Sequence, residues 1–397
     1  MPRTSCQLPQ LLVDWLLLAD DLTGALDSGV HFARAGLKTI VPLQKALGLS
    51  GAQALVINTE SRRMTPKGAA SACREAARNH PAAAVFKKID SILRGYPAIE
   101  LGAVMTALGI DRALVAPAFP AQGRVTRGGR VWVGGRPLEG EAASQSRQGD
   151  LTWLFRACAP LTLLSLEQVR GALTDLTVAM QGAGVFIGDA ETDGDLERLA
   201  LAARLSDIHL LCGSSGLAKA CAGPPRSVQG LRWPRPRLAV VGSRHPVSQA
   251  QVEFARRRGV RVLEAAGLAS AADPGEALEQ LAAGSADDLR RHQPVVIYPG
   301  RADQPAIGEA IMAERLGRLA TEVLQRTPVG GLYLSGGDTA MAVCRSLRVA
   351  ELELVDEVLP GLPLCRFTGG LFPGLTAITK AGAFGDESTL TDLLDLP

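Results

Sequence analysis

The chain is poor in aromatic residues and in net charge, and each shortage argues against a class of function. Phe, Trp and Tyr make up only 4% of its 397 residues, too few for the stacking platforms that hold nucleic-acid bases. Lysine and arginine (42) outnumber aspartate and glutamate (40) by two, so the chain as a whole does not attract a polyanion. We therefore expect no nucleic-acid partner.

The sequence also lacks paired cysteines, clustered histidines and long apolar runs. Its seven cysteines form no C-x-x-C pair and its five histidines no H-E-x-x-H motif, so no disulfide framework or zinc site is predicted and metal ligands stay unassigned. No window approaches the roughly 18 uninterrupted apolar residues of a membrane span. Asp14 interrupts the apolar N-terminal segment, which has no small-residue cleavage site, so a signal peptide is not predicted. We expect a cytoplasmic protein without membrane contact.

Short apolar strands alternate with helical segments rich in Ala, Leu and Arg, the pattern of repeated βαβ units. The predicted strands are 16–19, 39–43, 54–58, 84–88, 113–119, 185–189 and 209–213, then 238–242, 260–265, 294–300, 331–337, 363–367 and 375–380. Residues 223–237, rich in Pro, Gly and Arg, are predicted to be an interdomain linker. The predicted fold is α/β: two α/β domains with mostly parallel sheets, residues 1–230 and 238–397, and an interdomain active-site cleft.

Residues 16–27 (LLLADDLTGALD) carry the strongest local signal. An apolar strand ends at Asp20 and Asp21, and Thr23-Gly24 leads into a helix-like segment. Ligands of open α/β sheets bind outside the carboxyl ends of the strands, where a carboxylate can orient a hydroxyl, take its proton or hold Mg²⁺. Asp20 and Asp21 are therefore candidate catalytic residues. The alternative is that Asp20 ends the strand and that Asp21 or Thr23 caps the helix.

A second stretch, 86–101 (FKKIDSILRGYPAIEL), places basic and hydroxyl side chains at another strand end. Lys87 and Lys88 alternate to opposite faces of the strand, so at most one of them enters a cleft. Lysine and arginine beside serine and aspartate suit a carboxylate or phosphate with neighbouring hydroxyls. The candidate residues are thus one lysine with Asp90, Ser91 and Arg94. The alternative is a solvated strand end followed by a capped helix.

Two other segments are basic. NTESR (58–62) also follows a strand, and it ends in Arg62, with Arg63 next. Residues 117–136 (PAFPAQGRVTRGGRVWVGGR) hold four arginines among glycines and are predicted to be mostly a basic loop, of which a substrate anion could draw on one or two.

Three glycine-containing turns follow strands in the second half of the chain: GSRHP (242–246), LSGGDTA (334–340) and TKAGAFGDEST (379–389). Backbone amides at a helix N-terminus can bind a phosphate, and Gly382 and Gly385 permit close backbone approach. Three such turns in one half predict a nucleotide-phosphate site. There is no G-x-x-x-x-G-K-[ST] and no G-x-G-x-x-G motif, so neither a P-loop nor a standard dinucleotide fold is indicated.

Taken in order, these segments resemble the four-carbon acid sugar kinase family. The resemblance extends from about residue 17 to 390 and rests on ADDLTGALDSGVHFARAG, KKIDSILRG with Glu100 after it, APAFPAQGR, CGSSGLAKA, VVGSRHPVS, LSGGDTA, PGLPL and KAGAFGD. It implies transfer of the γ-phosphoryl group of ATP to the 4-hydroxyl of a tetronic acid: threonate, erythronate or 3-oxo-tetronate. It also implies that the N-terminal domain binds the sugar acid and that the C-terminal domain binds the nucleotide.

The resemblance assigns roles by position. Asp20 or Asp21 would be catalytic, with Asp386 as the next candidate base. The small-molecule sugar acid would bind Arg62, Lys88, Asp90, Ser91 and Arg94. ATP, bound with Mg²⁺, would contact Ser243, Gly336, Gly337, Asp338, Thr339, Lys380 and Gly382.

The sequence departs from the family pattern in three places. Ala381 stands where the family has serine, the GSRHP turn replaces a serine-rich turn, and EGEAASQSRQGD (139–150) replaces a segment with threonine and Asp-Pro. The preferred acid and its stereochemistry, the pathway and the oligomeric state, a homodimer among the options, are therefore not set by the sequence. The alternatives are a kinase of another small hydroxy acid and a non-catalytic binding protein with a decayed ATP site.

Overall fold

The computed structural model describes residues 13–44, 51–139, 149–226, 233–269, 274–300 and 307–396. The chain divides into two compact units: Met1–Thr39 with Ser50–Pro225, and Ile40–Leu49 with Arg226–Pro397. A short segment from the N-terminal half therefore belongs to the second unit, which the sequence pattern does not predict. Within the predicted linker, residues 227–232 lie outside the described part.

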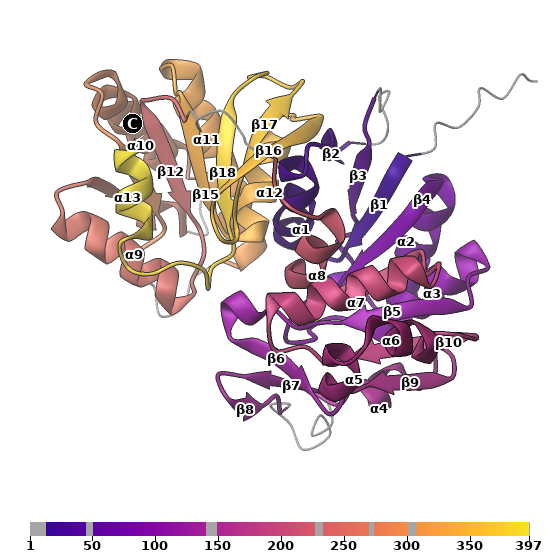
Figure 1. Cartoon of the computed structure of the whole chain (residues 1–397). Helices are drawn as coiled ribbons and strands as arrows, with labels where there is room; N and C mark the ends of the chain where they lie inside the picture. The colour runs from indigo at the N-terminus through magenta and orange to yellow at the C-terminus, as the bar shows by residue number, and fades with distance from the viewer. Residues whose placement is uncertain are drawn as a thin grey trace, which may run out of the picture. The chain divides into compact units, whose positions relative to one another are not determined.

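A parallel sheet forms the centre of the first unit, as the alternation of strands and helices predicts (Figure 1). In sheet order its strands are β3 (Ala54–Asn58), β1 (Val13–Ala19), β4 (Ala82–Lys88), β11 (Leu210–Gly213), β5 (Arg112–Ala116), β10 (Gly184–Gly188) and β9 (Leu161–Leu164). Every pairing among them is parallel. Helices cover both faces, so the inner strands are buried and read as continuous apolar runs instead of alternating ones.

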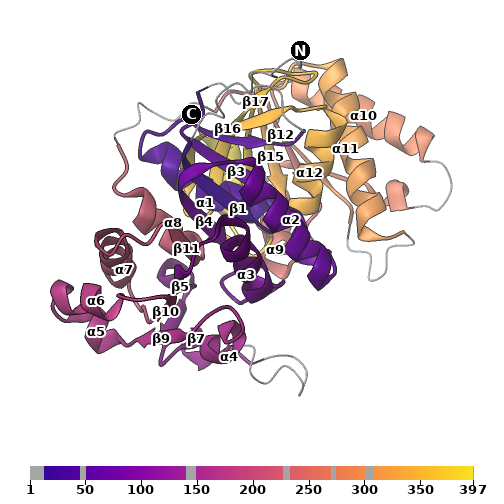
Figure 2. The ribbon, with the colours of Figure 1, turned by 90° about the vertical axis from the view of Figure 1, so that its right-hand side faces the viewer.

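The helices of the first unit fall into two layers. Right-handed crossovers place helices on opposite faces when the chain moves across the sheet in opposite directions. One layer contains α2 (Pro66–Asn79) and α3 (Pro97–Leu108), which pack side by side in Figure 2. The other contains α1 (Leu22–Arg34), α7 (Asp193–Leu205) and α8 (Ser215–Ala222). Shorter elements are η1 (Ser61–Arg63), α4 (Leu151–Phe155), α5 (Leu166–Arg170) and α6 (Leu173–Ala179).

Residues 117–136 are mostly folded, so the basic-loop prediction was wrong. After η2 (Pro120–Gln122) come three antiparallel strands: β6 (Arg124–Arg127), β7 (Arg130–Val133) and β8 (Arg136–Pro137). The backbone N–H groups of Gly128 and Gly129 donate to the Asp189 carboxylate at 2.6 and 2.9 Å, which fixes the turn between β6 and β7. The strands escape detection because few of their residues are buried; Thr126 and Val131 are the fully enclosed ones among those described.

The second unit is also built on strands, most of them parallel. In order its strands are β13 (Arg261–Glu264), β14 (Val295–Tyr298), β12 (Arg237–Val241), β15 (Gly331–Ser335), β18 (Thr376–Lys380), β17 (Leu362–Thr368), β16 (Glu351–Leu359) and β2 (Thr39–Pro42). The first five are parallel, and the last three pair antiparallel. The strand predicted at 39–43 exists, and it pairs antiparallel with β16, a pairing that its position in the sequence did not suggest.

Helices again form two layers. On one face α9 (Pro246–Arg257) packs with α13 (Thr389–Asp395), over a core that includes Trp233 and Tyr333. The other layer contains α10 (Gly275–Arg290), α11 (Glu309–Arg326) and α12 (Gly337–Ser346) in a row (Figure 1). The short η4 (Ala266–Ala269) packs near α10 and α11.

Each sheet has a point at which its direction of growth reverses. In the first unit the chain leaves β1 to form β3 on one side and then β4 on the other. In the second unit it leaves β12 for β13 and β14, and then forms β15 on the opposite side. Ligands of doubly wound sheets bind at such switch points, outside the carboxyl ends of the strands. The candidate residues of both units follow the strands that flank these points.

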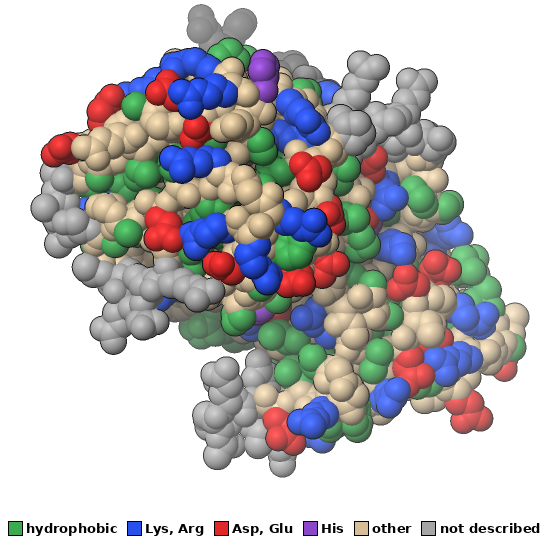
Figure 3. All heavy atoms as spheres, turned by 90° about the vertical axis from the view of Figure 1, so that its left-hand side faces the viewer, with side chains coloured by type: hydrophobic (Ala, Val, Ile, Leu, Met, Phe, Trp, Pro, Cys, Tyr) green, Lys and Arg blue, Asp and Glu red, His purple; other side chains and the backbone are tan. Residues whose placement is uncertain are grey.

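Charged side chains on the surface are mixed in sign. Figure 3 shows acidic and basic side chains interspersed over the face that it presents, so no single-sign field gathers there. This agrees with the formal net charge of +2. Within the described ranges, no helix combines the length and apolarity needed to traverse a lipid bilayer.

Candidate functional site

Asp20 and Asp21 stand at the carboxyl end of β1, at the switch point of the first unit. Asp20 is 2% exposed, whereas the side chain of Asp21 retains 24% of its accessible surface. Asp21 is the N-cap of α1: its Oδ1 accepts the backbone N–H of Gly24 at 2.8 Å, and its Oδ2 accepts the Thr23 hydroxyl at 2.9 Å. The capping role considered for Asp21 is therefore real, and it leaves Oδ2 able to accept a further bond from Arg62.

Arg62, on η1, joins the carboxylates of this site. Its Nε and Nη2 donate to the two carboxylate oxygens of Asp20 at 2.8 and 2.9 Å, and its Nη1 donates to Asp21 Oδ2. Burial opposes ionisation of Asp20, but the hydrogen bonds and charge of Arg62 prevail and lower the pKa of this carboxyl. Burial also disfavours the charged guanidinium, yet Asp21 and Asp20 raise its pKa. Asp20 and Arg62 are both ionised at neutral pH.

Asp90 and Arg94 extend the charge cluster from the turn after β4. Arg94 Nη2 donates to Asp90 Oδ2 at 2.6 Å, and Arg62 Nη2 lies 3.7 Å from the same oxygen. Asp90 Oδ1 accepts the backbone N–H of Ile92 at 3.0 Å, which closes the turn. Burial again opposes ionisation, but Arg94 and Arg62 lower the pKa of Asp90 to about 2. Arg94 itself keeps 59% of its side chain exposed, so it faces solvent and any incoming ligand.

Lys88 differs from its neighbours because it interacts with Asp20 and Asp90 through its charge alone, without a hydrogen bond or ion pair to any described residue. It is 5% exposed. A Cβ on Gly24 would lie 3.1 Å from this nitrogen, so the ammonium rests against the first turn of α1. Ser91 is partly exposed in the adjoining turn, which ends at Gly95 with a φ of 84°. An enclosed cation of this kind is suited to an anionic ligand.

Arg124, which the residue assignments from sequence omit, also faces this cluster. It begins β6, and its Nη1 lies 3.4 Å from Gln122 Oε1. Its Nε is buried and has no hydrogen-bond partner among the described residues. Burial lowers its pKa, and its charge interacts with those of Asp90 and Arg94. The sequence signal was the arginine in FPAQGR, but the arginines of 117–136 could not be told apart without the fold.

The loops after β12, β15 and β18 of the second unit touch one another. A Cβ on Gly382 would overlap Ser243 Oγ, and a Cβ on Gly242 would overlap Thr339 Oγ1. A Cβ on Gly336 would lie 3.3 Å from the backbone nitrogen of Ser243. The three glycine turns named from sequence thus meet at the switch point of this unit, and glycine is what allows their backbones to approach so closely.

The N-terminus of α12 lies at this junction. Gly336, with a φ of 103°, is its N-cap and, as a glycine, supplies no side-chain cap. The first-turn N–H groups have no carbonyl partner inside the helix, and they carry the positive end of the helix dipole. Asp338 is exposed beside them, Gly337 is partly exposed, and Thr339 is buried. This arrangement is suited to a phosphate.

Lys380 lies beneath the third turn. Its ammonium is 1% exposed and donates to the carbonyl oxygens of Ala381, Gly382 and Phe384 at 3.1–3.2 Å, and to Ser248 Oγ at 3.2 Å. Burial lowers the pKa of Lys380 to about 7. The side chain therefore shapes the turn at 381–384 from below through backbone carbonyls.

Asp386, the competing candidate base, lies in the turn just before the last helix, α13. Its Oδ1 accepts the backbone N–H groups of Ser388 and Thr389 at 3.1 and 3.0 Å and the Thr389 hydroxyl at 2.8 Å. These hydrogen bonds lower its pKa. Asp386 Oδ1 therefore has a structural role in the turn that leads into α13.

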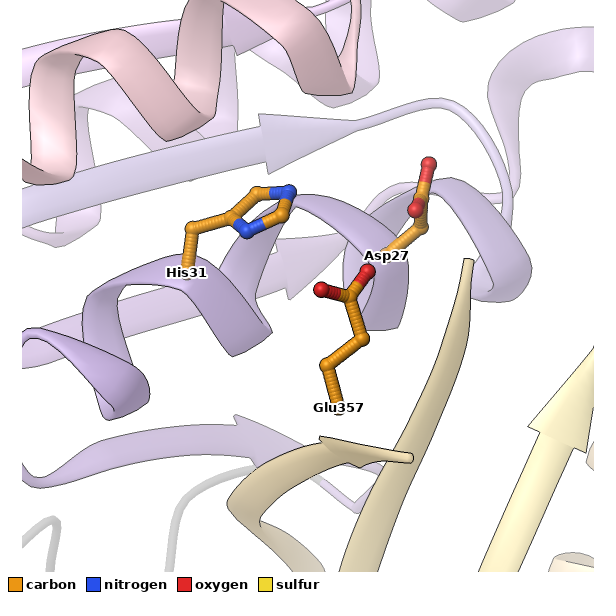
Figure 4. Close-up of side chains that lie close together, drawn as sticks. All are labelled: Asp27, His31 and Glu357. Carbon is orange, nitrogen blue, oxygen red and sulfur yellow. The ribbon is translucent and has the colours of Figure 1, made fainter. Parts of the chain in front are cut away.

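Figure 4 shows Asp27 and His31 on successive turns of α1. His31 Nε2 lies 2.9 Å from Ser215 Oγ, and the Ser215 hydroxyl donates to the Asp27 carbonyl oxygen at 3.0 Å. Burial lowers the pKa of His31 to about 3, so its imidazole is neutral. These contacts tie α1 to α8, while Glu357, the third side chain drawn, belongs to the second unit.

Comparison with known proteins assigns a description to each half. Residues 15–221 match a family model described as the sugar-binding N-terminal domain, and residues 238–390 match one described as the nucleotide-binding C-terminal domain. The charged cluster at the ends of β1 and β4 falls within the first of these ranges, and the three glycine turns fall within the second.

Curated relatives align over nearly the whole chain. A D-threonate kinase of Cupriavidus necator is 35% identical, covering 95% of this chain and 96% of the relative. A D-threonate kinase of Salmonella typhimurium is 34% identical (96% and 97% covered), and a D-erythronate kinase of Heliobacterium modesticaldum is 30% identical (96% of each). A solved structure from Salmonella typhimurium superposes with a TM-score of 0.77 at 21% identity, covering 96% of this chain and 98% of that one, which shows the shared fold.

Proposed function

Because this chain belongs to the four-carbon acid sugar kinase family, we propose that it transfers the γ-phosphoryl group of ATP to the 4-hydroxyl of D-threonate. The family and the kinase activity on four-carbon sugar acids predicted from the sequence are confirmed. D-threonate is the acid named for relatives at 35% and 34% identity, against 30% for the erythronate kinase. The observation that carries the proposal is the cluster of carboxylates and cations at the ends of β1 and β4. In this cluster Lys88 makes no hydrogen bond or ion pair with any residue that the structure describes.

The cations of the cluster provide the proposed site for the sugar carboxylate. Lys88 is enclosed and makes no hydrogen bond or ion pair with a described residue, Arg94 is exposed, and Arg124 has a buried Nε without a hydrogen bond among the described residues. The charges of all three act on Asp90. A guanidinium can hold a carboxylate through two parallel hydrogen bonds, and an ammonium adds a point charge. Ser91, in the same turn, would contact a substrate hydroxyl.

The two aspartates have separate proposed tasks. Phosphoryl transfer needs alignment, charge neutralisation and a group that orients the attacking oxygen. Both carboxylate oxygens of Asp20 are occupied by Arg62, so Asp20 holds that guanidinium in place. Asp21 keeps more exposed surface and is the group we propose to orient the 4-hydroxyl and accept its proton. Asp90 completes the set of carboxylates around Arg62.

ATP fits the glycine turns of the second unit. A Cβ at Gly242 or Gly382 would overlap the hydroxyl of Thr339 or Ser243, and a Cβ at Gly336 would approach the backbone of Ser243. These three turns lie at the N-terminus of α12, where the positive end of a helix dipole favours a phosphate. We propose that Ser243, Gly337, Asp338 and Thr339 bind the triphosphate, with Lys380 acting through the carbonyls of its turn. Mg²⁺ bound to the phosphates would neutralise their charge during transfer. Arg62 already occupies Asp20 and Asp21, so we assign no protein ligand to the metal.

A coupled ADP-release assay tests this function. We expect the highest kcat/KM with D-threonate in a panel that also contains L-threonate, D-erythronate and 3-oxo-tetronates, and no turnover without Mg²⁺. A higher kcat/KM for another four-carbon acid would contradict the choice of D-threonate. The segment 140–148, where the sequence departs from the family pattern, lies outside the described residues. The same panel of acids therefore shows which acid the enzyme prefers with this segment in place.

Arg94→Ala is expected to raise the KM for the sugar acid about tenfold and to leave the KM for ATP nearly unchanged. A hydrogen bond to a charged group contributes about 1.5–3 kcal/mol. Because Arg94 is largely exposed, we expect its contribution to the binding free energy of the acid to lie at the lower end of this range. Steady-state kinetics with each substrate varied in turn measures both constants. Arg78→Ala, at an exposed position in the last turn of α2, is the matched control and should change neither. An equal rise in both constants would contradict a role confined to the acid.

A further inference from the structure

Lys87 is a fully buried cation under the sugar-acid site. Its Nζ forms an ion pair with Glu100 Oε2 at 2.8 Å and donates to the carbonyl oxygens of Leu18 at 3.3 Å and Lys88 at 2.7 Å. Leu18 lies two residues before Asp20, and Lys88 lies two residues before Asp90. One ammonium thus joins the carboxyl ends of β1 and β4.

Glu100 extends this connection to the element that carries Arg62. Its Oε1 accepts the Ser61 hydroxyl at 2.5 Å, and Ser61 precedes Arg62 on η1. The Ser61 and Thr59 hydroxyls lie 2.8 Å apart, and Thr59 Oγ1 donates to the Ala19 carbonyl at 2.9 Å. Glu100 itself is 1% exposed in the first turn of α3. Close contacts between polar atoms therefore connect α3 through η1 to β1, with hydrogen bonds at both ends of this connection.

We propose that the Lys87–Glu100 pair is a positioning device for the sugar-acid site, which it holds in register by fixing the ends of β1 and β4 and the start of η1. This inference rests on the proposed function. A buried ion pair adds little net stability compared with a well-packed apolar pair of similar volume. What an apolar pair cannot supply is the set of directed bonds to Leu18, Lys88 and Ser61. Those bonds place Asp20, Asp90 and Arg62 next to one another.

The pair also acts on the charge of the site. Lys87 is among the cations that lower the pKa of Asp20. Burial disfavours the ammonium, but Glu100 outweighs burial and raises the pKa of Lys87, so the cation persists at neutral pH. Asp20 Oδ1 and Oδ2 accept hydrogen bonds from Arg62, and these bonds weaken if Asp20 gains a proton. Loss of Lys87 should therefore shift the pH profile of the enzyme as well as its geometry.

The test replaces both partners at once, in the double variant Lys87→Met and Glu100→Leu. Removing one partner leaves a buried charge unpaired and should lower the melting temperature strongly, whereas the double variant should recover most of it. We expect the recovered protein to keep a kcat/KM for the sugar acid at least about tenfold below that of the parent, because directed hydrogen bonds are lost. The acid limb of its pH profile of kcat/KM should move to higher pH, and its KM for ATP should stay near the parental value.

A matched control is the double variant Arg170→Met and Asp195→Leu, which removes an ion pair of 2.8 Å between α5 and α7 in the same unit. It should change stability without shifting the pH profile or the KM for the acid. Parental kinetics and an unshifted pH profile in the Lys87/Glu100 double variant would overturn the inference. If that variant does not fold, the Glu100→Gln variant, whose side chain has nearly the same shape, must show the same loss of kcat/KM for the sugar acid. If the parent phosphorylates none of the four-carbon acids, the proposed function is wrong. The positioning role can still be tested in that case, because calorimetry compares the affinity for the acid in the parent and in the double variant.

Discussion

Asp21→Asn should lower kcat with the sugar acid by about 10²–10⁴-fold while ATP binding is retained, because the loss of a general base typically costs this much. Asparagine caps helices as well as aspartate does, so the N-terminus of α1 should remain intact. Asp20→Asn should also lower kcat, but by a different route: it weakens the two hydrogen bonds that orient Arg62. Single-turnover kinetics and calorimetry with ATP separate the chemical step from nucleotide binding.

Asp386→Asn is the control for this prediction. Its carboxylate caps the start of α13 through Ser388 and Thr389, so the variant should keep kcat near the parental value. If Asp386→Asn loses kcat and the Asp21 and Asp20 variants turn over like the parent, the base is in the second unit and the assignment made here is wrong.

Gly382→Val should weaken ATP binding by about 10–100-fold without loss of sugar-acid binding to the first unit. A Cβ at this position overlaps Ser243 Oγ and lies 3.0 Å from His245 Cβ, so the turn must move away from the loop after β12. Overpacking of this kind costs about 1–3 kcal/mol, which corresponds to the stated change in affinity. Calorimetry with ATP and with the acid measures the two affinities separately.

Gly284→Val in α10 is the matched control, since a Cβ at Gly284 meets no atom within 4 Å. It should leave both affinities unchanged, apart from the small cost of a β-branched residue in a helix. Circular dichroism must show that both variants are folded. Unchanged ATP affinity in folded Gly382→Val would place the nucleotide elsewhere and contradict the proposed role of the three turns.

The local sequence predicted a strand correctly where the strand is buried on both faces. The inner strands β1, β3, β4 and β12 were predicted because parallel strands covered on both faces are continuous apolar runs. The same rule failed for β6 and β7, whose arginines and glycines lack that signal. Strand alternation also predicted that Lys87 and Lys88 point to opposite faces, so that at most one of them enters a cleft. In the structure Lys87 pairs with Glu100, whereas the Lys88 ammonium lies close to Gly24.

Pairing across the chain could not be derived from such patterns. The strand at 39–43 looked like part of the first domain, and its hydrogen-bond partner β16 lies some 300 residues away. Likewise Arg124 was one arginine among several until the fold placed it beside Asp90 and Arg94. The roles given to the site residues stay predictions, which the variants above test.

By itself the sequence determined the α/β class, because apolar runs that alternate with helical segments are a local property of the chain. Its ordered motifs resembled one family closely enough to identify it, and its charged and glycine turns led to the prediction of strand ends for ligand binding. Tertiary structure alone decided which side chains meet there. Arg62 gathers Asp20, Asp21 and Asp90, and Lys87 pairs with Glu100, because sheet order brings β1, β3 and β4 side by side. A charged group's partner depends on that order, and no local pattern encodes it.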